Sequence, residues 1–298
     1  MNKLDTAKRS QIISGVVEGC SIRSISRMTG CSKNTIVKLL VELGAACADF
    51  MDKNLVNLPC KRVQVDEIWS FCYAKAKNVT PEIKAKNPAA GDVWTWVAID
   101  ADTKLIPSWI VGPRDGTTAR IFVNDLAKRL ANRIQLTSDG LSVYLGAVEK
   151  AFRGHVDYAM LQKIYADTSE GQKRYSPAEC IGCETHVIDG DPDPKHISTS
   201  YIERQNLTMR MPMRRFTRLT NAFSKKLQNH YHALALYFVF YNFVKMHKTL
   251  KMTPALAAKI TDRLWTMEDI VALIDAEAPK PGPRGPYKKQ KQTEGKAT

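Results

Sequence analysis

The sequence lacks an apolar run long enough to cross a bilayer, and it lacks the apolar core of a signal peptide. A membrane-spanning helix needs about 20 apolar residues, whereas the longest candidate, residues 233–244, is shorter and is better interpreted as a buried helix. The N-terminus, Met-Asn-Lys-Leu-Asp, carries none of the apolar stretch that a signal peptide requires. We therefore expect a cytoplasmic protein with no membrane partner.

The sequence also has fewer acidic than basic residues, and its cysteines are odd in number. Aspartate and glutamate number 30 against 44 lysines and arginines, which leaves a net charge of +14. A basic surplus of this size favours a polyanionic partner, and the leading candidate is nucleic acid. The seven cysteines are scattered and odd in number, which suits a reducing cytosol. With 44% hydrophobic and 25% charged residues, the chain has the composition of a folded protein.

Residues 1–50 carry the pattern of a compact helical unit. Apolar residues at helical spacing predict a helix over residues 7–18, which Gly19 ends. Ser21 can cap a short second helix over residues 22–28, with its apolar residues on one side.

A third helix follows, capped by Ser32 and stopped by Gly44. The spacing of the second and third helices resembles the helix-turn-helix of DNA-binding domains, whose second helix enters the major groove with its first residues on base edges. The residues at that position are Ser32, Lys33, Asn34 and Thr35. The alternative is a three-helix interaction module that does not bind DNA.

Residues 61–71 predict a β-strand because they are rich in β-branched and aromatic side chains. Asp66 and Glu67 lie at its centre and must point to opposite faces, since side chains alternate along a strand. Burying a carboxylate costs free energy unless it has a partner. Asp66 therefore either forms a buried ion pair or holds a metal ion, and Glu67 is the more natural structural residue.

Predicted strands and helices continue to about residue 160. Strands over 92–100 and 105–111 can pair with the first strand as an antiparallel meander. Helices and strands then alternate over 118–131, 133–138, 142–152 and 156–160, and these strands can add in parallel. The expected fold is therefore a mixed α/β fold in which Asp139, at the carboxyl end of its strand, lies close to Asp66.

Three ordered blocks carry a family resemblance. They are Val65-Asp-Glu-Ile-Trp69, Thr137-Ser-Asp-Gly140 and Ser200-Tyr-Ile-Glu-Arg-Gln-Asn206. Together they resemble the DDE transposases of bacterial insertion sequences, most closely the insertion-sequence-one family. Residues 202–218 are similar to that family's signature around its glutamate, and residues 241–255 are similar to the end of such domains.

The resemblance implies an RNase H-like catalytic domain in which Asp66, Asp139 and Glu203 hold two Mg²⁺ or Mn²⁺ ions. Hard oxygen ligands suit these cations, and two ions can activate a water or a 3′-hydroxyl and stabilise the leaving oxygen at phosphorus. The implied function is a transposase that binds insertion-sequence ends in double-stranded DNA, cuts there, and joins the freed 3′-hydroxyl to target DNA. A homo-oligomer on DNA and a nucleoid-associated location in a bacterium are implied with it.

We expect a helix-turn-helix domain, a linker, a catalytic domain with an insertion, C-terminal helices and a disordered basic tail. Their expected ranges are 1–50, 51–61, 62–252 with the insertion at about 161–197, 253–277, and 278–298.

Plainer interpretations exist for several of these residues. Asp139 before a glycine can be a turn residue. Ser200-x-x-Glu203 has the spacing of a capping box, in which the glutamate only ties off the start of a helix. The alternative function is that of a non-enzymatic helix-turn-helix DNA-binding regulator with a degenerate RNase H-like domain.

A basic stretch surrounds Glu203. Asn206 and Arg210 lie three and seven residues beyond Glu203, on the same helix face. That face is either near the scissile phosphate or simply solvated. Arginines in such a stretch are expected to contact phosphates, which gives affinity without sequence choice. The residues expected to contact DNA here are Arg204, Asn206, Arg210, Arg214, Arg215 and Arg218.

The insertion at 161–197 is expected to be irregular. Its Cys180-x-x-Cys183 spacing fits half of a Zn²⁺ site, which His186 and His196 could complete. The second half lacks the usual paired spacing, so a zinc site and an ordinary polar surface both remain open.

Overall fold

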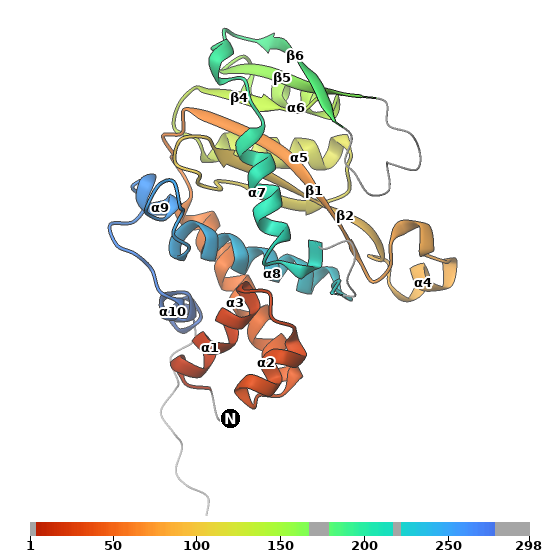
Figure 1. Ribbon diagram of the computed structural model, residues 1–298, viewed down its shortest axis with the longest axis vertical. Helices are drawn as coiled ribbons and strands as arrows, with labels where there is room; N and C mark the ends of the chain where they lie inside the picture. Colours follow the sequence, from red (N-terminus) through yellow and green to blue (C-terminus); the bar gives the residue numbers. More distant parts are fainter. Residues whose placement is uncertain (1–3, 167–178, 217–221, 278–298) are drawn as a thin grey trace, which may run out of the picture.

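The computed structural model describes residues 4–166, 179–216 and 222–277 (Figure 1). The predicted tail at 278–298 lies outside the described residues, as does Arg218. No helix in the described part of the chain is long and apolar enough to span a membrane.

Three helices form the N-terminal unit: α1 (Thr6–Val17), α2 (Ile22–Thr29) and α3 (Lys33–Asn54). The predicted serine caps are confirmed. Ser21 Oγ accepts a hydrogen bond from the Ser24 amide, and Ser32 Oγ accepts one from the Thr35 amide. These contacts satisfy amides that have no partner within the first turn.

Two expectations for this region are wrong. Helix α3 does not stop at Gly44 but continues to Asn54, so that the predicted linker begins inside the helix. The rest of that linker is partly buried, with Leu55 and Leu58 in the core. Gly44 is needed for packing instead, because a Cβ added there would lie 2.3 Å from His232 Cβ. At this point α3 crosses α8 (Leu227–Val239) at close range.

The fold is mixed α/β, as predicted, with a six-stranded sheet in the order β3-β2-β1-β4-β5-β6. The six strands are β1 (Arg62–Cys72), β2 (Gly91–Asp100), β3 (Trp109–Gly112), β4 (Ile134–Ser138), β5 (Val156–Tyr165) and β6 (Cys180–Asp189). The first three pair antiparallel, and β4 and β5 then add in parallel to β1, as the sequence predicts. The third strand is shorter than expected, since residues 105–108 are not part of it.

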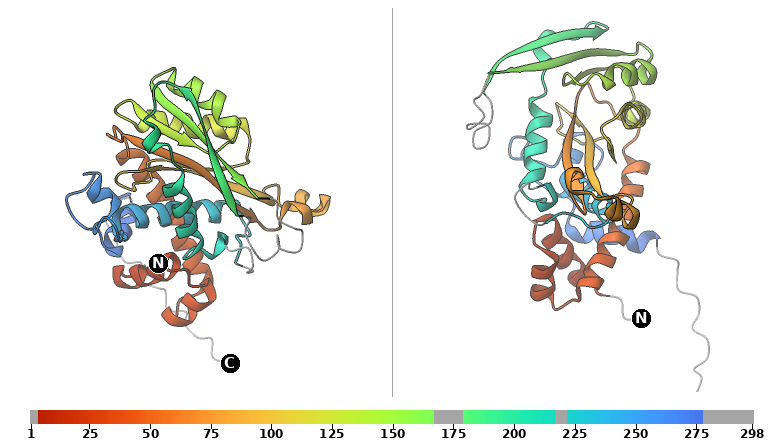
Figure 2. Two further views of the ribbon diagram at one scale, coloured as in Figure 1. Left: turned by 45° about the horizontal axis from the view of Figure 1, so that its top comes forward. Right: turned by 90° about the vertical axis from the view of Figure 1, so that its right-hand side faces the viewer.

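Helices cover both faces of the sheet (Figure 2, right). On one face lie α5 (Gly116–Arg129) and α6 (Val143–Phe152). Trp96 of β2 packs there against Phe122 of α5 and Tyr144 of α6. On the other face lie α7 (Ser200–Arg210) and α8.

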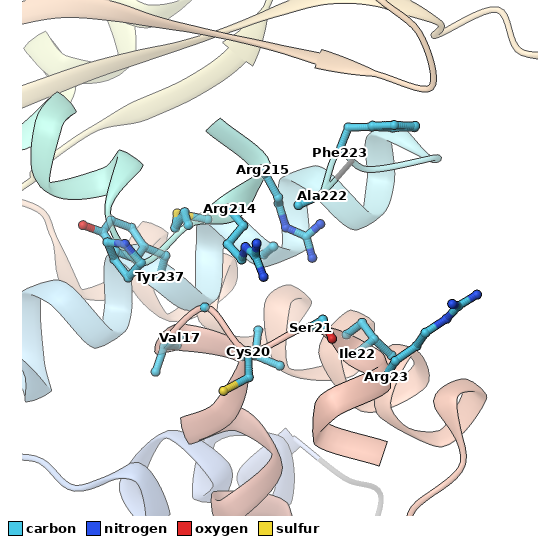
Figure 3. A pocket seen from close by; sticks show the side chains of 15 residues that line it. Val17, Cys20, Ser21, Ile22, Arg23, Arg214, Arg215, Ala222, Phe223 and Tyr237 are labelled. Carbon is cyan, nitrogen blue, oxygen red and sulfur yellow. The ribbon is translucent and has the colours of Figure 1, made fainter. Parts of the chain in front are cut away.

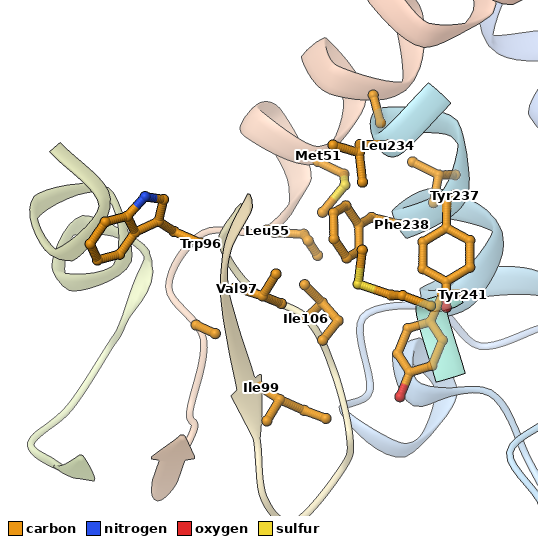
Figure 4. Close-up of a cluster of buried hydrophobic side chains, with 14 of the residues drawn as sticks. Met51, Leu55, Trp96, Val97, Ile99, Ile106, Leu234, Tyr237, Phe238 and Tyr241 are labelled. Atoms are coloured by element: carbon orange, nitrogen blue, oxygen red, sulfur yellow. The ribbon is translucent and has the colours of Figure 1, made fainter. Parts of the chain in front are cut away.

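Figure 4 shows the alternation along β2 directly, because Trp96 and Val97 point to opposite sides of the strand. Val97 and its neighbours face Leu234 and Phe238 of α8, which are fully buried. Burial of such large side chains is the main stabilising term at both faces of the sheet.

The insertion at 161–197 is more regular than the sequence predicts. Strand β5 continues to Tyr165, and β6 pairs with it antiparallel. The short turn η2 (Pro194–His196) then leads into α7. The sequence does not indicate this strand, because β6 is largely exposed and has little of the apolar alternation that marks a half-buried strand.

The remaining elements are short. Residues 73–90 contain η1 (Ala76–Asn78) and α4 (Pro81–Lys86), which stand away from the body of the molecule in Figure 1. The turn η3 (Arg214–Phe216) follows α7. Helix α8 ends in a π-helical segment, η4 (Phe240–Val244), and the two segments together contain residues 233–244, which the sequence predicts as a buried helix.

Two C-terminal helices appear as predicted, α9 (Pro254–Ala257) and α10 (Met267–Glu277). Helix α10 packs against α1 and α3 rather than standing apart. The contact includes Arg9, whose buried guanidinium donates to both carboxylate oxygens of Asp275 at 2.9 and 2.8 Å. Bidentate pairs of this kind are among the stronger polar contacts in proteins.

Candidate metal centre

Three carboxylates meet beside the centre of the sheet. One oxygen each of Asp66, Glu67 and Asp139 lies within 4.8 Å of the other two. Asp66 is in the middle of β1, and Asp139 directly follows the parallel neighbour β4. The predicted proximity of Asp66 and Asp139 is therefore confirmed. Among the described residues, no other group of three or more acidic, histidine or cysteine ligands comes this close together.

Asp66 is held by two hydrogen bonds. Its Oδ1 accepts from the Glu67 amide at 2.8 Å, and its Oδ2 accepts from Asn206 Nδ2 at 2.7 Å. Burial raises the pKa of Asp66 from 3.8 to about 7, and the negative charges of Glu67, Asp139 and Glu203 act in the same direction. Crowded carboxylates of this kind favour a bound proton or a cation.

Glu67 joins this group although its side chain contacts the α5–α6 side of the sheet. Its Oε1 accepts from the Tyr144 hydroxyl, and its Oε2 accepts from Arg114 Nε at 3.1 Å. The side chain is only 1% exposed. Strand alternation predicts the direction of Glu67 correctly, but it does not reveal that one of its oxygens lies within reach of Asp66 and Asp139.

Helix α7 brings Glu203 and Asn206 to the same cavity. The first amides of α7 lack a side-chain cap from Thr199, the residue before the helix. Instead, Gln64 of β1 reaches across and accepts from the amides of Tyr201 and Ile202 at 2.9 and 3.1 Å. A strand residue two positions before Asp66 therefore fixes the start of the helix over the strand.

Glu203 lines the cavity but stands outside the group of three. Its Oε2 accepts from Lys163 Nζ at 2.5 Å, and its Oε1 accepts from Thr199 Oγ1 at 2.7 Å. The predicted capping box does not form, because Ser200 is already the first residue of α7 and the Glu203 side chain meets Thr199 instead.

The cavity around these groups, called the acidic cavity below, has a volume of about 720 Å³. Three basic residues line it with the four acids: Arg114, Lys163 and Arg210. Arg114 Nη2 lies 3.8 Å from Asp139 Oδ2. The predicted common face of Glu203, Asn206 and Arg210 is confirmed, since all three line the cavity.

Sequence reasoning missed Arg114 and Lys163. Arg114 follows β3, and Lys163 lies on the second half of β5, in the region expected to be irregular. Their contacts depend on strand pairing across the sheet, and no local motif marks either residue.

The donor set fits a hard divalent cation. Carboxylate oxygens are the ligands that Mg²⁺ and Mn²⁺ prefer. Asn206 adds a further oxygen beside Asp66, because its buried Oδ1 has no hydrogen-bond partner within the described residues. An unused buried acceptor costs free energy unless something satisfies it.

The predicted DNA-contacting residues lie in three places. Residues 32–35 are exposed at the start of α3, and Arg204 is exposed on α7. Arg214 is exposed in η3, whereas Arg215 is half-buried there and donates to Ser224 Oγ at 2.6 Å. Burial lowers the pKa of Arg215 to about 10.

The four predicted zinc ligands are not brought together. Cys180, Cys183 and His186 lie along β6, and His186 Nε2 is 3.9 Å from Glu184. His196 lies in η2 instead, with its Nδ1 2.6 Å from Arg62 Nη1.

Comparison with known proteins shows a distant structural similarity. The sequence matches no protein-family model and no curated protein. Among solved structures, the cryo-EM structure of a piggyBac transposase synaptic complex with hairpin DNA is similar at a TM-score of 0.39 and 9% identity, over 92% of this chain and 73% of that chain. A likeness this distant carries no argument about function, which must come from the residues of the site.

Proposed function

We propose that this chain is a divalent-metal-dependent DNA transposase that cleaves DNA at the ends of an insertion sequence and transfers the 3′-hydroxyl into target DNA. The observation that carries the proposal is the meeting of Asp66, Glu67 and Asp139 within 4.8 Å, in a protein of net charge +14. The three sequence blocks that resemble DDE transposases support it, because they contain the acidic residues of this cavity.

The metal site of the proposal consists of Asp66, Asp139 and a third carboxylate from α7, Glu203. These residues would hold two Mg²⁺ or Mn²⁺ ions, which supply an activated oxygen nucleophile and neutralise charge at phosphorus. The proposed fold is RNase H-like, an assignment favoured by the central position of β1 and the parallel addition of β4 and β5.

The chain's own residues have separate tasks in this scheme. Asn206 orients Asp66 through its 2.7 Å hydrogen bond. Arg210 lines the same cavity and can hold a non-bridging phosphate oxygen. Lys163 Nζ donates to Glu203 Oε2 at 2.5 Å in the metal-free protein. If Glu203 bound a metal ion instead, Lys163 would be free to contact a DNA phosphate.

DNA recognition is assigned to the N-terminal unit and the basic stretch after Glu203. Ser32, Lys33, Asn34 and Thr35 are exposed at the first turn of α3, where a helix-turn-helix would meet base edges. Arg204, Arg214, Arg215 and Arg218 are assigned to phosphate contacts. Two element ends must be held together, so the proposed active form is a homo-oligomer on double-stranded DNA.

The test is a strand cleavage and joining assay on DNA that carries the element's own terminal repeats. Wild type and Asp139→Asn are compared with Mg²⁺ and with EDTA. Glu149→Gln is the matched control, since Glu149 is an exposed carboxylate outside the acidic cavity. We expect Mg²⁺-dependent joined products from wild type and the control, and none from Asp139→Asn.

Binding of the terminal repeats without cleavage under Mg²⁺ or Mn²⁺ would overturn the enzymatic proposal. The protein would then be a DNA-binding regulator, and the carboxylates would be structural. Cleavage that is equally strong in Asp139→Asn would instead place the chemistry at another site.

A further inference from the structure

A second cavity lies between the N-terminal helices and the segment that follows α7 (Figure 3). Its volume is about 440 Å³, within the usual range for small-ligand sites. One wall is the corner between α1 and α2, from Val16 to Arg23. The opposite wall comes from residues 212–215, residues 222–223, and two residues of α8. We call it the basic cavity, because three arginines line it and none of its described lining residues is acidic.

The two walls contact each other directly. Gly19, at the corner between α1 and α2, has a φ of +80°, and a Cβ there would lie 2.3 Å from the Pro212 carbonyl oxygen. The basic cavity is therefore bounded by a tight contact between distant parts of the chain, and glycine is required at that point.

Two of the arginines reach into this space. Figure 3 shows Arg214 and Arg215 extending from their segment toward the α1–α2 corner, whereas Arg23 extends away to the side. Arg215 donates to the Ser224 hydroxyl at 2.6 Å, but no carboxylate among the described residues forms an ion pair with Arg214 or Arg215. A half-buried guanidinium without a counter-charge is costly, and an anion from outside the chain would offset that cost.

The surroundings of Arg215 confirm that its charge is uncompensated. Burial lowers the pKa of Arg215 to about 10, and the Cys72 thiol acts in the opposite direction. Burial raises the pKa of Cys72 to about 11, so this thiol is protonated at pH 7 and carries no counter-charge. The adjacent His230 is fully buried, and burial together with the Arg215 charge lowers its pKa to about 3. His230 is therefore neutral at pH 7 and adds no second positive charge beside Arg215.

The rest of the lining is apolar or belongs to a helix start. Val17, Ile22, Phe223 and Tyr237 provide flat or branched apolar surface beside the arginines. Helix α2 is eight residues long, and its first turn also lines the cavity. The N-terminus of a helix carries partial positive charge. A ligand that fits this combination has an anionic group joined to an apolar or aromatic part.

We propose that the basic cavity is a binding site for the phosphate group of a nucleotide, with Arg214 and Arg215 on the phosphate and the apolar wall against the sugar and base. The phosphate comes either from a DNA strand or from a free nucleotide. The site is separate from the acidic cavity, and the proposal rests on the transposase function only where DNA is the source. Occupancy would join the N-terminal unit to residues 212–215 through the ligand.

The experiment measures binding by calorimetry, without divalent metal, for three probes: inorganic phosphate, a deoxynucleoside monophosphate, and a short single-stranded oligonucleotide. Wild type is compared with Arg214→Gln and Arg215→Gln. Arg120→Gln is the matched control, because Arg120 is an exposed arginine of α5 outside the cavity. Arg215→Lys serves if Arg215→Gln does not fold, and it keeps the charge while removing the planar fork.

We expect each glutamine variant to weaken binding of the oligonucleotide or the mononucleotide at least about tenfold, the effect of losing one charged hydrogen bond. The control should bind as wild type does. Saturable binding of the mononucleotide, with competition by the oligonucleotide, identifies free nucleotide as a ligand, whereas binding of the oligonucleotide alone identifies a strand of DNA.

Unchanged affinity in both Arg214 and Arg215 variants, or no binding of any of the three probes to wild type, would overturn the proposal. The same titrations on Asp139→Asn separate this result from the fate of the transposase proposal. Cleavage can fail in that variant while the basic cavity still binds its phosphate, because Asp139 does not line it.

Discussion

The acidic and basic cavities differ in the charge that each leaves unbalanced, although one segment of chain lines both. Glu203, Asn206 and Arg210 of α7 line the acidic cavity, and residues 212–215 directly after α7 line the basic one. In the first, four carboxylates face three basic side chains, and the pKa of Asp66 is raised to about 7. In the second, three arginines line the cavity and no acidic side chain does so within the described part of the chain.

We infer that the two cavities bind different groups, metal ions in one and a phosphate of the DNA strand in the other. A site in which carboxylates outnumber basic side chains is suited to metal ions, and a site lined by arginines without carboxylates is suited to phosphate. Because α7 and η3 are consecutive, a DNA strand held in the basic cavity would be fixed at a set distance from the acidic one. Substitutions that affect one cavity and not the other would establish two distinct sites, each with its assigned ligand.

The largest expected effect is the loss of strand cleavage when the proposed third metal ligand, Glu203, is replaced. Glu203→Gln should reduce strand cleavage at least about a hundredfold, because loss of a metal ligand removes several kcal/mol of transition-state stabilisation. Glu67→Gln should retain measurable cleavage, since Glu67 already accepts from Tyr144 and Arg114. Cleavage rates and Mn²⁺ titrations of the two variants provide the measurement.

A larger effect of Glu67→Gln than of Glu203→Gln would make Glu67, not Glu203, the third metal ligand. If Glu67→Gln lost Mn²⁺ binding and Glu203→Gln kept it, the metal centre would consist of the three carboxylates that already lie within 4.8 Å. Glu203 would then be a structural partner of Lys163 and Thr199.

Local signals explain why much of the fold could be predicted from the sequence. Ser21 and Ser32 act as caps within three residues of their partners, and the alternation in β1 and β2 depends only on neighbouring positions. The same reasoning places Asp66 mid-strand and Asp139 at a strand end, so their meeting followed from the parallel pairing of β1 and β4.

The failures concern contacts between distant parts of the chain. Gly44 has the local signature of a helix stop, but its neighbour His232 is 188 residues away and the helix continues past it. Arg114 and Lys163 reach the acidic cavity only through the register of β3 and β5. Gln64, which caps α7 from β1, has no sequence signature at all.

The second prediction concerns the contact between α3 and α8, which supports the basic cavity but not the acidic one. Gly44→Ala should destabilise the protein by about 1–3 kcal/mol, since the new methyl group meets the His232 backbone and cannot be avoided by a side-chain rotation. Helix α8 contributes Ala233 and Tyr237 to the basic cavity and nothing to the acidic one. Phosphate binding should therefore weaken in this variant while Mn²⁺ binding is preserved.

Gly146→Ala is the matched control for that substitution. Gly146 lies on the exposed face of α6, and a Cβ there meets nothing within 4 Å. The change should stabilise the protein by about 0.5–1 kcal/mol, because alanine favours a helix interior. Chemical denaturation of both variants gives the two values, and equal behaviour would show that the contact between α3 and α8 tolerates a methyl group.

The third prediction concerns pH. The Asp66 carboxyl has a pKa of about 7 when folded and metal-free, against an ordinary value of 3.8. Between these values the folded state binds more protons than the unfolded chain, so its free energy of unfolding should fall as pH rises from about 4 to about 7. Denaturation in EDTA across that range should show this slope in wild type and a flatter one in Asp66→Asn. An identical slope in the variant would exclude Asp66 as its source.

The smallest expected effect is a change in salt dependence. Each phosphate contact contributes about 0.9 to the slope of log K against log salt concentration for duplex DNA. Arg214→Gln should therefore reduce that slope by about 1, whereas Arg120→Gln, outside the basic cavity, should leave it unchanged. Binding of the terminal repeats at several salt concentrations, in the absence of metal, gives the slopes. A full slope in Arg214→Gln combined with a loss of mononucleotide binding would mean that the basic cavity serves a free nucleotide, because a DNA phosphate held by Arg214 must release its counterions when it binds.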